Sequence, residues 1–124
     1  MIASGKSLWR LMALAAAAAL FIVSADTARS EEEARRFDLR VENGRVVGDL
    51  KVVRVRRNDT VEIHWTADRR TVVHLHGYDI ETVIEAGAPK TMSFRARATG
   101  RFPIETHGAG GRHRTLIHLE VHPR

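Results

Sequence analysis

The chain of 124 residues contains no cysteine. It can therefore form no disulfide bond, and it has no thiolate to offer a metal ion or a substrate. Without a disulfide, a domain of this size has to be held together by an apolar core, by a bound metal or by both. Aromatic residues are also few, at 6% of the sequence, and the arginines are interleaved with acids instead of clustering with aromatics. No nucleic-acid partner is therefore expected, although a weak attraction to anionic lipid or polymer is compatible with the charge.

Long apolar runs are absent except for one close to the N-terminus. Lys6 and Arg10 precede an apolar run from Leu11 to Val23, and small residues up to Ala25 follow at the positions that a signal peptidase recognises. The 13 residues of this run would cover about 20 Å as a helix, whereas the hydrocarbon core of a bilayer is about 30 Å thick. Residues 1–25 are therefore predicted to be a cleaved signal peptide, with a retained membrane anchor as the alternative. The mature protein is expected to be a periplasmic or secreted bacterial protein without a membrane span.

The mature chain is expected to carry only a mild positive charge. Removal of residues 1–25 takes away Lys6 and Arg10 and no acid, so the formal net charge falls by two, from +5 to +3. Residues 26–36 carry several charges without an apolar period. This stretch is therefore predicted to be a linker.

From Phe37 onward, apolar and polar residues alternate over short segments that are separated by turn residues such as Asn43-Gly44. A period of two is typical of strands with one buried face. Residues 37–122 are therefore predicted to form one all-β domain, an antiparallel β-sandwich or barrel of eight or nine strands. Pro103 lacks a ladder donor, so its strand is expected to be bulged, or to lie at a sheet edge, at that point. The predicted strands are 37–41, 46–47, 52–56, 60–66, 71–76, 80–84, 91–96, 101–107 and 115–121.

Two histidines, His74 and His76, lie two residues apart in one of these predicted strands. Alternate residues of a strand project from the same face, so the two imidazoles are expected to point the same way. Neutral imidazole is the commonest side-chain ligand of transition metals, and this spacing delivers two ring nitrogens to one point. The same pattern also fits two half-buried strand residues without a metal.

Two strings of residues give the sequence a family resemblance: His-Leu-His-Gly-Tyr-Asp at 74–79 and Gly-Arg-Phe-Pro-Ile-Glu-Thr-His at 100–107. Together with residues 55–63, and with a glycine at 87 ahead of a phenylalanine at 94, they resemble the cupredoxin-like domains found as small exported bacterial proteins. The resemblance spans about residues 37–121. It implies a Greek-key β-sandwich and a copper ion as the cofactor. The sequence departs from the blue-copper members, because no cysteine stands near Thr106, where their thiolate ligand would be expected. A blue-copper electron-transfer centre is therefore excluded.

The resemblance also implies that the strands of His74 and Glu105 are neighbours. In that case His74, His76, Glu105 and His107 emerge on one face, and directly opposed residues have Cβ atoms about 5 Å apart. Three imidazoles and one carboxylate suit Cu(II), or alternatively Zn(II), better than Cu(I), which prefers sulfur ligands. These four residues are the predicted metal ligands.

Further residues are weaker candidates. His113, in the glycine-rich loop, could close the coordination sphere, as the C-terminal ligand does in cupredoxins. Asp79 and Tyr78 could orient an imidazole through its other nitrogen, although Tyr78 fits a packed corner equally well. A cupin-like arrangement is a minor alternative, in which Glu81 replaces Glu105 as the carboxylate ligand. Without a metal, these polar residues would form the solvated face of a strand.

Three functions fit these observations. The first is an exported metal-binding module that serves copper trafficking, storage or sensing, with a possible periplasmic or membrane protein as its partner. The second is a metal-free sandwich that acts as an interaction or accessory domain. The third is a small cupin-like metalloenzyme, which would need a substrate-sized pocket, and a chain this short leaves little material for one. The first is favoured over an enzymatic function, and no catalytic residue is assigned.

Overall fold

The computed structural model describes residues 33–108 and 111–124, and within these two ranges the protein contains nine strands and no helix. The predicted signal peptide and most of the predicted linker lie outside the described residues. Nothing helical in the described part is long and apolar enough to cross a membrane. The strands are β1 (Arg35–Glu42), β2 (Arg45–Val46), β3 (Val52–Arg56), β4 (Thr60–Ala67), β5 (Thr71–Leu75), β6 (Ile80–Ile84), β7 (Lys90–Arg95), β8 (Gly100–His107) and β9 (His113–His122).

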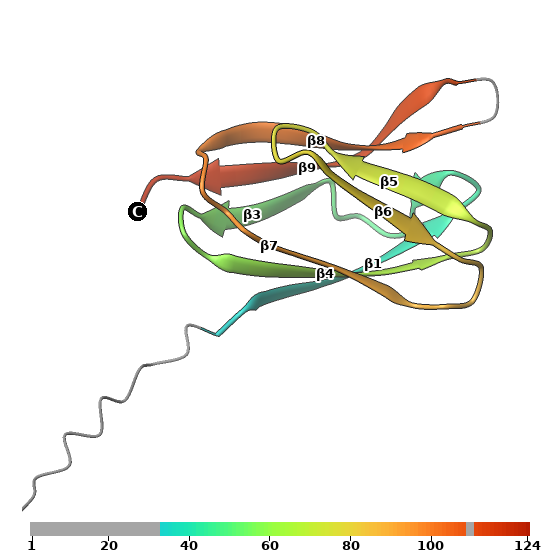
Figure 1. Ribbon diagram of the computed structural model, residues 1–124, viewed down its shortest axis with the longest axis horizontal. Coiled ribbons are helices and arrows are strands. Elements are labelled where there is room, and N and C mark those ends of the chain that lie inside the picture. The colour runs from blue at the N-terminus through green and yellow to red at the C-terminus, as the bar shows by residue number, and fades with distance from the viewer. Residues whose placement is uncertain (1–32, 109–110) are drawn as a thin grey trace, which may run out of the picture.

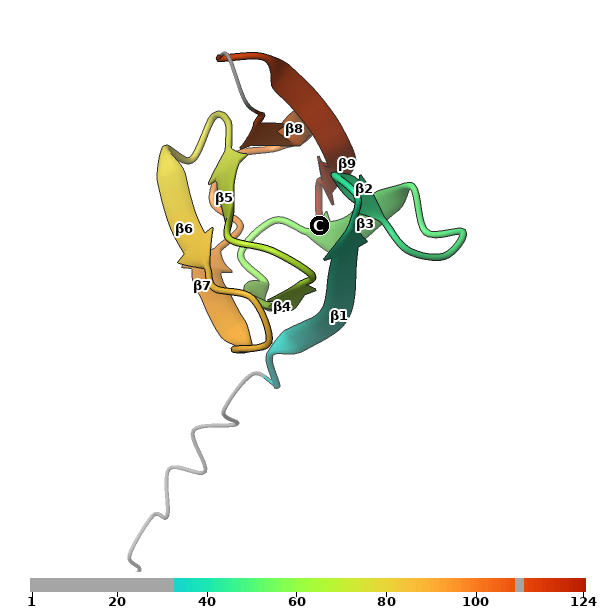
Figure 2. The ribbon, with the colours of Figure 1, turned by 90° about the vertical axis from the view of Figure 1, so that its right-hand side faces the viewer.

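The strands form two sheets that pack face to face (Figure 1). One sheet has the strand order β2-β1-β4-β7, and the other has the order β3-β9-β8-β5-β6. Figure 2 shows the strands of both sheets arranged around one interior, which is filled by a single cluster of apolar side chains. The prediction of an all-β domain built from two layers is confirmed.

The sandwich is predominantly antiparallel, as predicted, but two of its seven strand pairings are parallel. β1 pairs with β4, and β3 with β9, in parallel orientation, whereas the other five pairings are antiparallel. Parallel neighbours cannot be joined by a tight hairpin, so the chain has to leave the sheet and return between them. Five of the eight connections do cross from one sheet to the other. The alternation of apolar and polar residues specifies the buried face of a strand but not its direction.

The strands bury alternate residues, as the alternation predicts. Val61, Ile63 and Trp65 of β4 are completely buried, and so are Val73 and Leu75 of β5. Burial of apolar surface contributes roughly 25 cal/mol per Å², so this arrangement is strongly favoured over one in which the faces are exchanged. The core therefore fixes which side chains of each strand face outward.

Strand β1 begins two residues before the predicted domain boundary. Arg35 and Arg36, which were expected in the linker, pair in parallel with Val61 and Glu62 of β4. The Arg36 guanidinium also donates a hydrogen bond through Nε to Glu62, at 3.1 Å. These two arginines belong to the sheet through backbone pairing and one ion pair, which an apolar period cannot reveal.

Strand β8 is a central strand even though it contains Pro103. The Pro103 carbonyl accepts a hydrogen bond from the His76 backbone N–H, directly after β5 ends at Leu75. The nitrogen and the carbonyl of one strand residue point to the same side, so the missing N–H faces the end of β5 and the pairing with β9 loses no donor. The prediction that β8 is bulged, or lies at an edge, at Pro103 is therefore wrong, because β8 is central and Pro103 keeps its register with His118. A register shift does occur between Ile104 and Glu105, but its extra residue lies in β9.

Candidate metal centre

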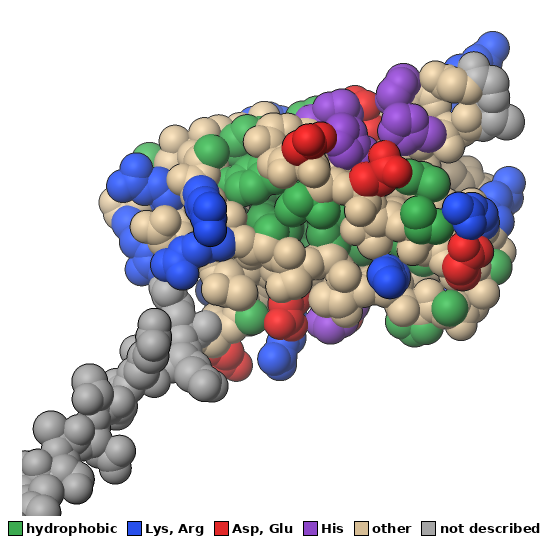
Figure 3. All heavy atoms as spheres, viewed as in Figure 1, with side chains coloured by type: hydrophobic (Ala, Val, Ile, Leu, Met, Phe, Trp, Pro, Cys, Tyr) green, Lys and Arg blue, Asp and Glu red, His purple; other side chains and the backbone are tan. Residues whose placement is uncertain are grey.

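The four predicted metal ligands lie on the outer face of β5 and β8, with His76 in the turn directly after β5. Strands β5 and β8 pair antiparallel, and their register sets His74 directly opposite Glu105. The predicted neighbourhood of these two strands is therefore confirmed. Six side chains, in contact with one another across this face, are called the histidine cluster (Figure 3): His74, His76, Asp79, Glu105, His107 and His113.

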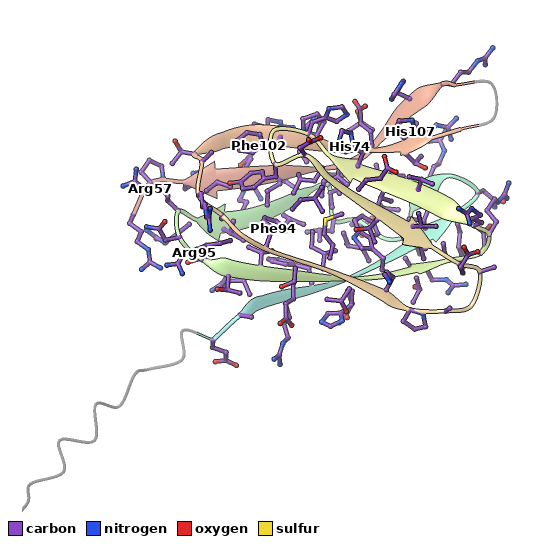
Figure 4. The ribbon with its side chains drawn as sticks, in the orientation of Figure 1. Arg57, His74, Phe94, Arg95, Phe102 and His107 are labelled. Carbon is purple, nitrogen blue, oxygen red and sulfur yellow. The ribbon has the colours of Figure 1, made fainter. Side chains whose placement is uncertain are left out.

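The four imidazoles of the histidine cluster form two contacting pairs. The ring centroids of His74 and His76 lie 4.3 Å apart, and those of His107 and His113 lie 4.4 Å apart, both in edge-on contact. His74 and His107 join the two pairs, with their ring centroids 6.3 Å apart (Figure 4). The ring nitrogens of four histidines are thereby gathered on one small patch of the sheet.

Glu105 connects the two imidazole pairs. Its Oε2 lies 2.8 Å from Nε2 of His76 and 3.6 Å from Nδ1 of His113. The Thr115 hydroxyl donates a hydrogen bond to Oε1 of Glu105 at 3.4 Å, a contact that the sequence alone does not indicate. The Glu105 side chain is only 20% exposed, so a carboxylate is held partly out of water between ring nitrogens. These are donor types that Cu(II) and Zn(II) both accept.

The position of His113 depends on the register shift between β8 and β9. At this shift β9 contains one extra residue, Leu116, relative to its partner. A slip of one residue turns every following side chain to the opposite face of the sheet. His113 consequently lies opposite His107 on the outer face, at the start of β9 and not in the loop where the sequence predicted it. The sequence does carry a signal for this, because the adjacent apolar residues Leu116 and Ile117 break the alternation.

Asp79 and Tyr78 lie in the turn that follows β5. Oδ1 of Asp79 lies 3.4 Å from Nε2 of His74, so this carboxylate joins the histidine cluster from the turn. The Tyr78 hydroxyl instead donates a hydrogen bond to the Ala98 carbonyl at 2.8 Å, and its ring packs edge-on against Phe102 with the centroids 5.1 Å apart. Tyr78 is therefore a packed corner residue that anchors the turn, and Asp79 is the residue that reaches an imidazole.

The carboxylate of the cupin-like alternative lies on the other side of His74. Glu81 of β6 is directly opposite His74, just as Glu105 is on β8. Of these two acids, Glu105 is the one that contacts imidazoles among the described side chains. The remaining described histidines lie outside the histidine cluster, His64 in the other sheet and His118 and His122 in β9.

The histidine cluster is not a formed coordination sphere as it stands. Within residues 33–108 and 111–124, no three His, Asp or Glu side chains converge in the way that metal ligands do. At His76, the hydrogen bond between Nε2 and Oε2 of Glu105 occupies the ring nitrogen that would face an ion. A divalent ion would take the place of the shared proton, and the other rings would have to rotate toward it. The donor types fit Cu(II) or Zn(II), whereas the thiolate of a blue-copper centre is missing.

Solved structures of copper proteins share this fold. The chain is similar to the multicopper oxidase mgLAC, with a TM-score of 0.59 and 23% identity over 74% of this chain and 40% of that chain. It is also similar to the copper nitrite reductase from Nitrosomonas europaea, with a TM-score of 0.56 and 18% identity over 74% of this chain and 42% of that chain. A chain of a heme-copper terminal oxidase dimer matches with a TM-score of 0.56 and 16% identity, over 76% of this chain and 67% of that chain. The protein therefore has a cupredoxin-like β-sandwich fold.

These similarities define a fold and not an activity. The chain spans only 40% and 42% of the lengths of the first two proteins. No protein-family model matches the sequence, and no curated protein matches it either. A function for this chain has to be argued from its own side chains.

Proposed function

We propose that the histidine cluster binds one divalent metal ion, with copper as the expected ion and zinc as the alternative. The protein would then be an exported metal-binding domain that serves copper trafficking, storage or sensing. The observation that carries this proposal is the meeting of four imidazoles and a half-buried carboxylate on one strand face. The proposed ligands are His74, His76, Glu105 and His107, with His113 and Asp79 at the margin.

The strand pairing supports the proposal because it limits what has to move. His74 and Glu105 are directly opposed on two paired strands, where Cβ atoms lie about 5 Å apart. Ligand bonds of about 2.0–2.2 Å from each side can then meet at one ion after side-chain rotation alone. Ligands on paired strands are held more rigidly than ligands on loops, which favours affinity and a defined geometry.

The donor types and the fold together favour copper in its divalent state. The histidine cluster offers nitrogen and oxygen, and the one sulfur atom among the described residues belongs to Met92, which is buried in the core. Cu(I) prefers sulfur ligands, whereas Cu(II) accepts imidazole and carboxylate. The similar solved structures are named as a multicopper oxidase and a copper nitrite reductase, which supports copper over zinc for a site on this fold.

A metal-free docking domain is the second candidate function. His76 and Glu105 are hydrogen-bonded to each other without an ion. The outer face can therefore exist as an ordinary polar surface without a metal. The cupin-like alternative is not supported, because the fold is cupredoxin-like and Glu81 contacts no imidazole among the described side chains.

Metal retention tests the proposal. Among the described residues the buried core begins at Leu39, with Phe37 packed against it, and residues 26–124 contain both. This metal-free domain is incubated with Cu(II) or Zn(II), passed through gel filtration and analysed for metal. Wild type should retain about one ion per chain and His74→Ala/His76→Ala none, with protons released on binding.

The matched control for this experiment is His64→Ala/His122→Ala, which removes two histidines outside the histidine cluster. It should retain metal as wild type does. Equal retention by both double variants would contradict the proposed ligands. Absence of metal from wild type would favour the docking domain.

A further inference from the structure

A hollow of about 490 Å³ opens beside the histidine cluster. It lies at the end of the sandwich where the β8–β9 hairpin extends past the neighbouring turns (Figure 1). The other walls are the β1–β2 turn and the connection from β4 to β5. Its volume falls within the range of about 300–1,000 Å³ that small-molecule sites occupy. The expectation that so short a chain leaves little material for a pocket is therefore too strict.

We call this hollow the arginine mouth. Its lining is strongly basic. It contains four arginines and two histidines, and no described Asp or Glu lines it. A cleft that is lined by positive side chains, without acids among them, raises the local concentration of anions. The basic lining residues are Arg69, Arg70, Arg112 and Arg114, together with His107 and His113 of the histidine cluster.

Two of the four arginines are already neutralised by acids outside the hollow. Arg69 contacts Asp68 at 3.4 Å, and Arg70 contacts Glu85 at 2.7 Å. Arg112 and Arg114 form no ion pair with any acid in the described part of the chain. The arginine mouth thus holds an excess of two positive charges that the described residues do not balance.

The fold holds Arg114 over the arginine mouth. The register shift that turns His113 to the outer face turns Arg114 to the opposite side of the hairpin, where its partner on β8 is the buried Thr106. Across the hollow stands Gly44, whose φ is +72° and whose absent Cβ would lie 3.2 Å from Nη1 of Arg114. A glycine at the β1–β2 turn therefore leaves room for this guanidinium.

We propose that the arginine mouth binds a small carboxylate anion with two or more negative charges. A guanidinium binds a carboxylate through two parallel hydrogen bonds, and a single carboxylate would leave one of the two unbalanced guanidinium groups without a partner. His107 and His113 belong to both sites, so such an anion would lie beside a metal ion bound as proposed above. Anion binding does not require the metal, however, so the two proposals can be tested independently of each other.

Isothermal titration of the metal-free domain, residues 26–124, with citrate at low ionic strength tests this proposal. Citrate should bind saturably, with about one anion per chain, and acetate should bind at least about tenfold more weakly because it carries one charge. Arg112→Gln/Arg114→Gln should weaken citrate binding about tenfold or more. Inorganic phosphate, tested in parallel, should bind more weakly than citrate.

The matched control is Arg56→Gln/Arg57→Gln. It changes the net charge by the same amount with two exposed arginines, and Figure 4 shows Arg57 at the other end of the molecule from His107. Citrate affinity should be unchanged in this variant. Equal weakening by both double variants would show that net charge alone attracts citrate, and would overturn the proposal. A wild-type titration without saturation, or tighter binding of phosphate than of citrate, would overturn it as well.

Discussion

The inner and outer faces of β5 and β8 differ in what they contribute. On the inner face, Val73, Leu75 and Ile104 are completely buried in the common core. On the outer face of the same strands, His74 and Glu105 face each other in a half-buried polar patch. Alternate positions of a strand point to opposite faces. Residues that stabilise the core therefore lie next to residues that could bind a metal, and the two kinds can be substituted separately. Substitutions on either face therefore test the division directly.

Truncation on the inner face has the largest expected effect. Leu75→Ala removes a fully buried side chain and leaves a cavity, so the free energy of unfolding should fall by about 2–5 kcal/mol. Chemical denaturation measures this loss. The matched substitution Val72→Ala, on the outer face of the same strand, should cost about 1 kcal/mol or less. Equal losses at the two positions would break the comparison between the faces.

The turn between β5 and β6 gives the next largest effect. Gly77 has a φ of +84°, and a Cβ there would lie 2.3 Å from Cδ1 of Phe102. Gly77→Ala therefore combines backbone strain with steric overlap and should cost about 2–4 kcal/mol. Gly48→Ala is the control, because Gly48 has a φ of +93° with open space around it and should cost only about 1–2 kcal/mol. Equal losses of unfolding free energy in the two variants would contradict the close packing of Gly77 against the Phe102 ring.

Substitution on the outer face should have a small effect on stability and a large one on metal response. His74→Ala/His76→Ala should change the unfolding free energy of the metal-free domain by no more than about 1 kcal/mol. Wild type should gain about 2.7 kcal/mol when Cu(II) is present at about a hundred times its Kd, and the double variant should gain nothing. Thermal unfolding with and without Cu(II) measures both effects. A Cu(II)-dependent rise in Tm that survives in the double variant would place the ion elsewhere.

The smallest expected effect is a pH dependence from Glu120, on the outer face of β9. Burial raises the pKa of this carboxyl, but the hydrogen bond from His122 and the charges of Arg54 and Arg101 outweigh it, so the pKa lies below its ordinary value. A carboxyl with a lowered pKa in the folded state stabilises the fold above its unfolded-state pKa, and this contribution is lost as the pH falls through the folded-state pKa. Glu120→Gln should therefore be less stable than wild type at neutral pH, with the difference shrinking below about pH 4. Denaturation across pH would contradict this if the difference were constant.

The faces of the strands could be predicted from the sequence, because burial follows side-chain type residue by residue. The alternation predicts Val73 and Leu75 in the core and His74 and His76 on the opposite face, and the structure confirms both. The neighbourhood of His74 and Glu105 came from the family resemblance, and the strand register confirms it.

Pairing direction and register could not be predicted in the same way, because they depend on which distant segments meet. The parallel pairing of β1 with β4 leaves no mark in the period of either strand. Leu116 and Ile117 break the alternation and mark an irregularity in the sequence. That His113 turns outward and Arg114 toward the arginine mouth, however, follows only from the pairing of β9 with β8. The arginine mouth itself brings together a turn, a connection and a hairpin, and no local pattern joins such segments.

The most direct test of the central claim, that the outer face of β5 and β8 ligates a divalent metal, is pulsed electron paramagnetic resonance of the Cu(II)-loaded domain. The account predicts a tetragonal Cu(II) centre with imidazole nitrogen from three histidines, and the loss of about one nitrogen in each of His74→Ala, His76→Ala and His107→Ala. The same nitrogen count in these variants as in wild type would contradict it.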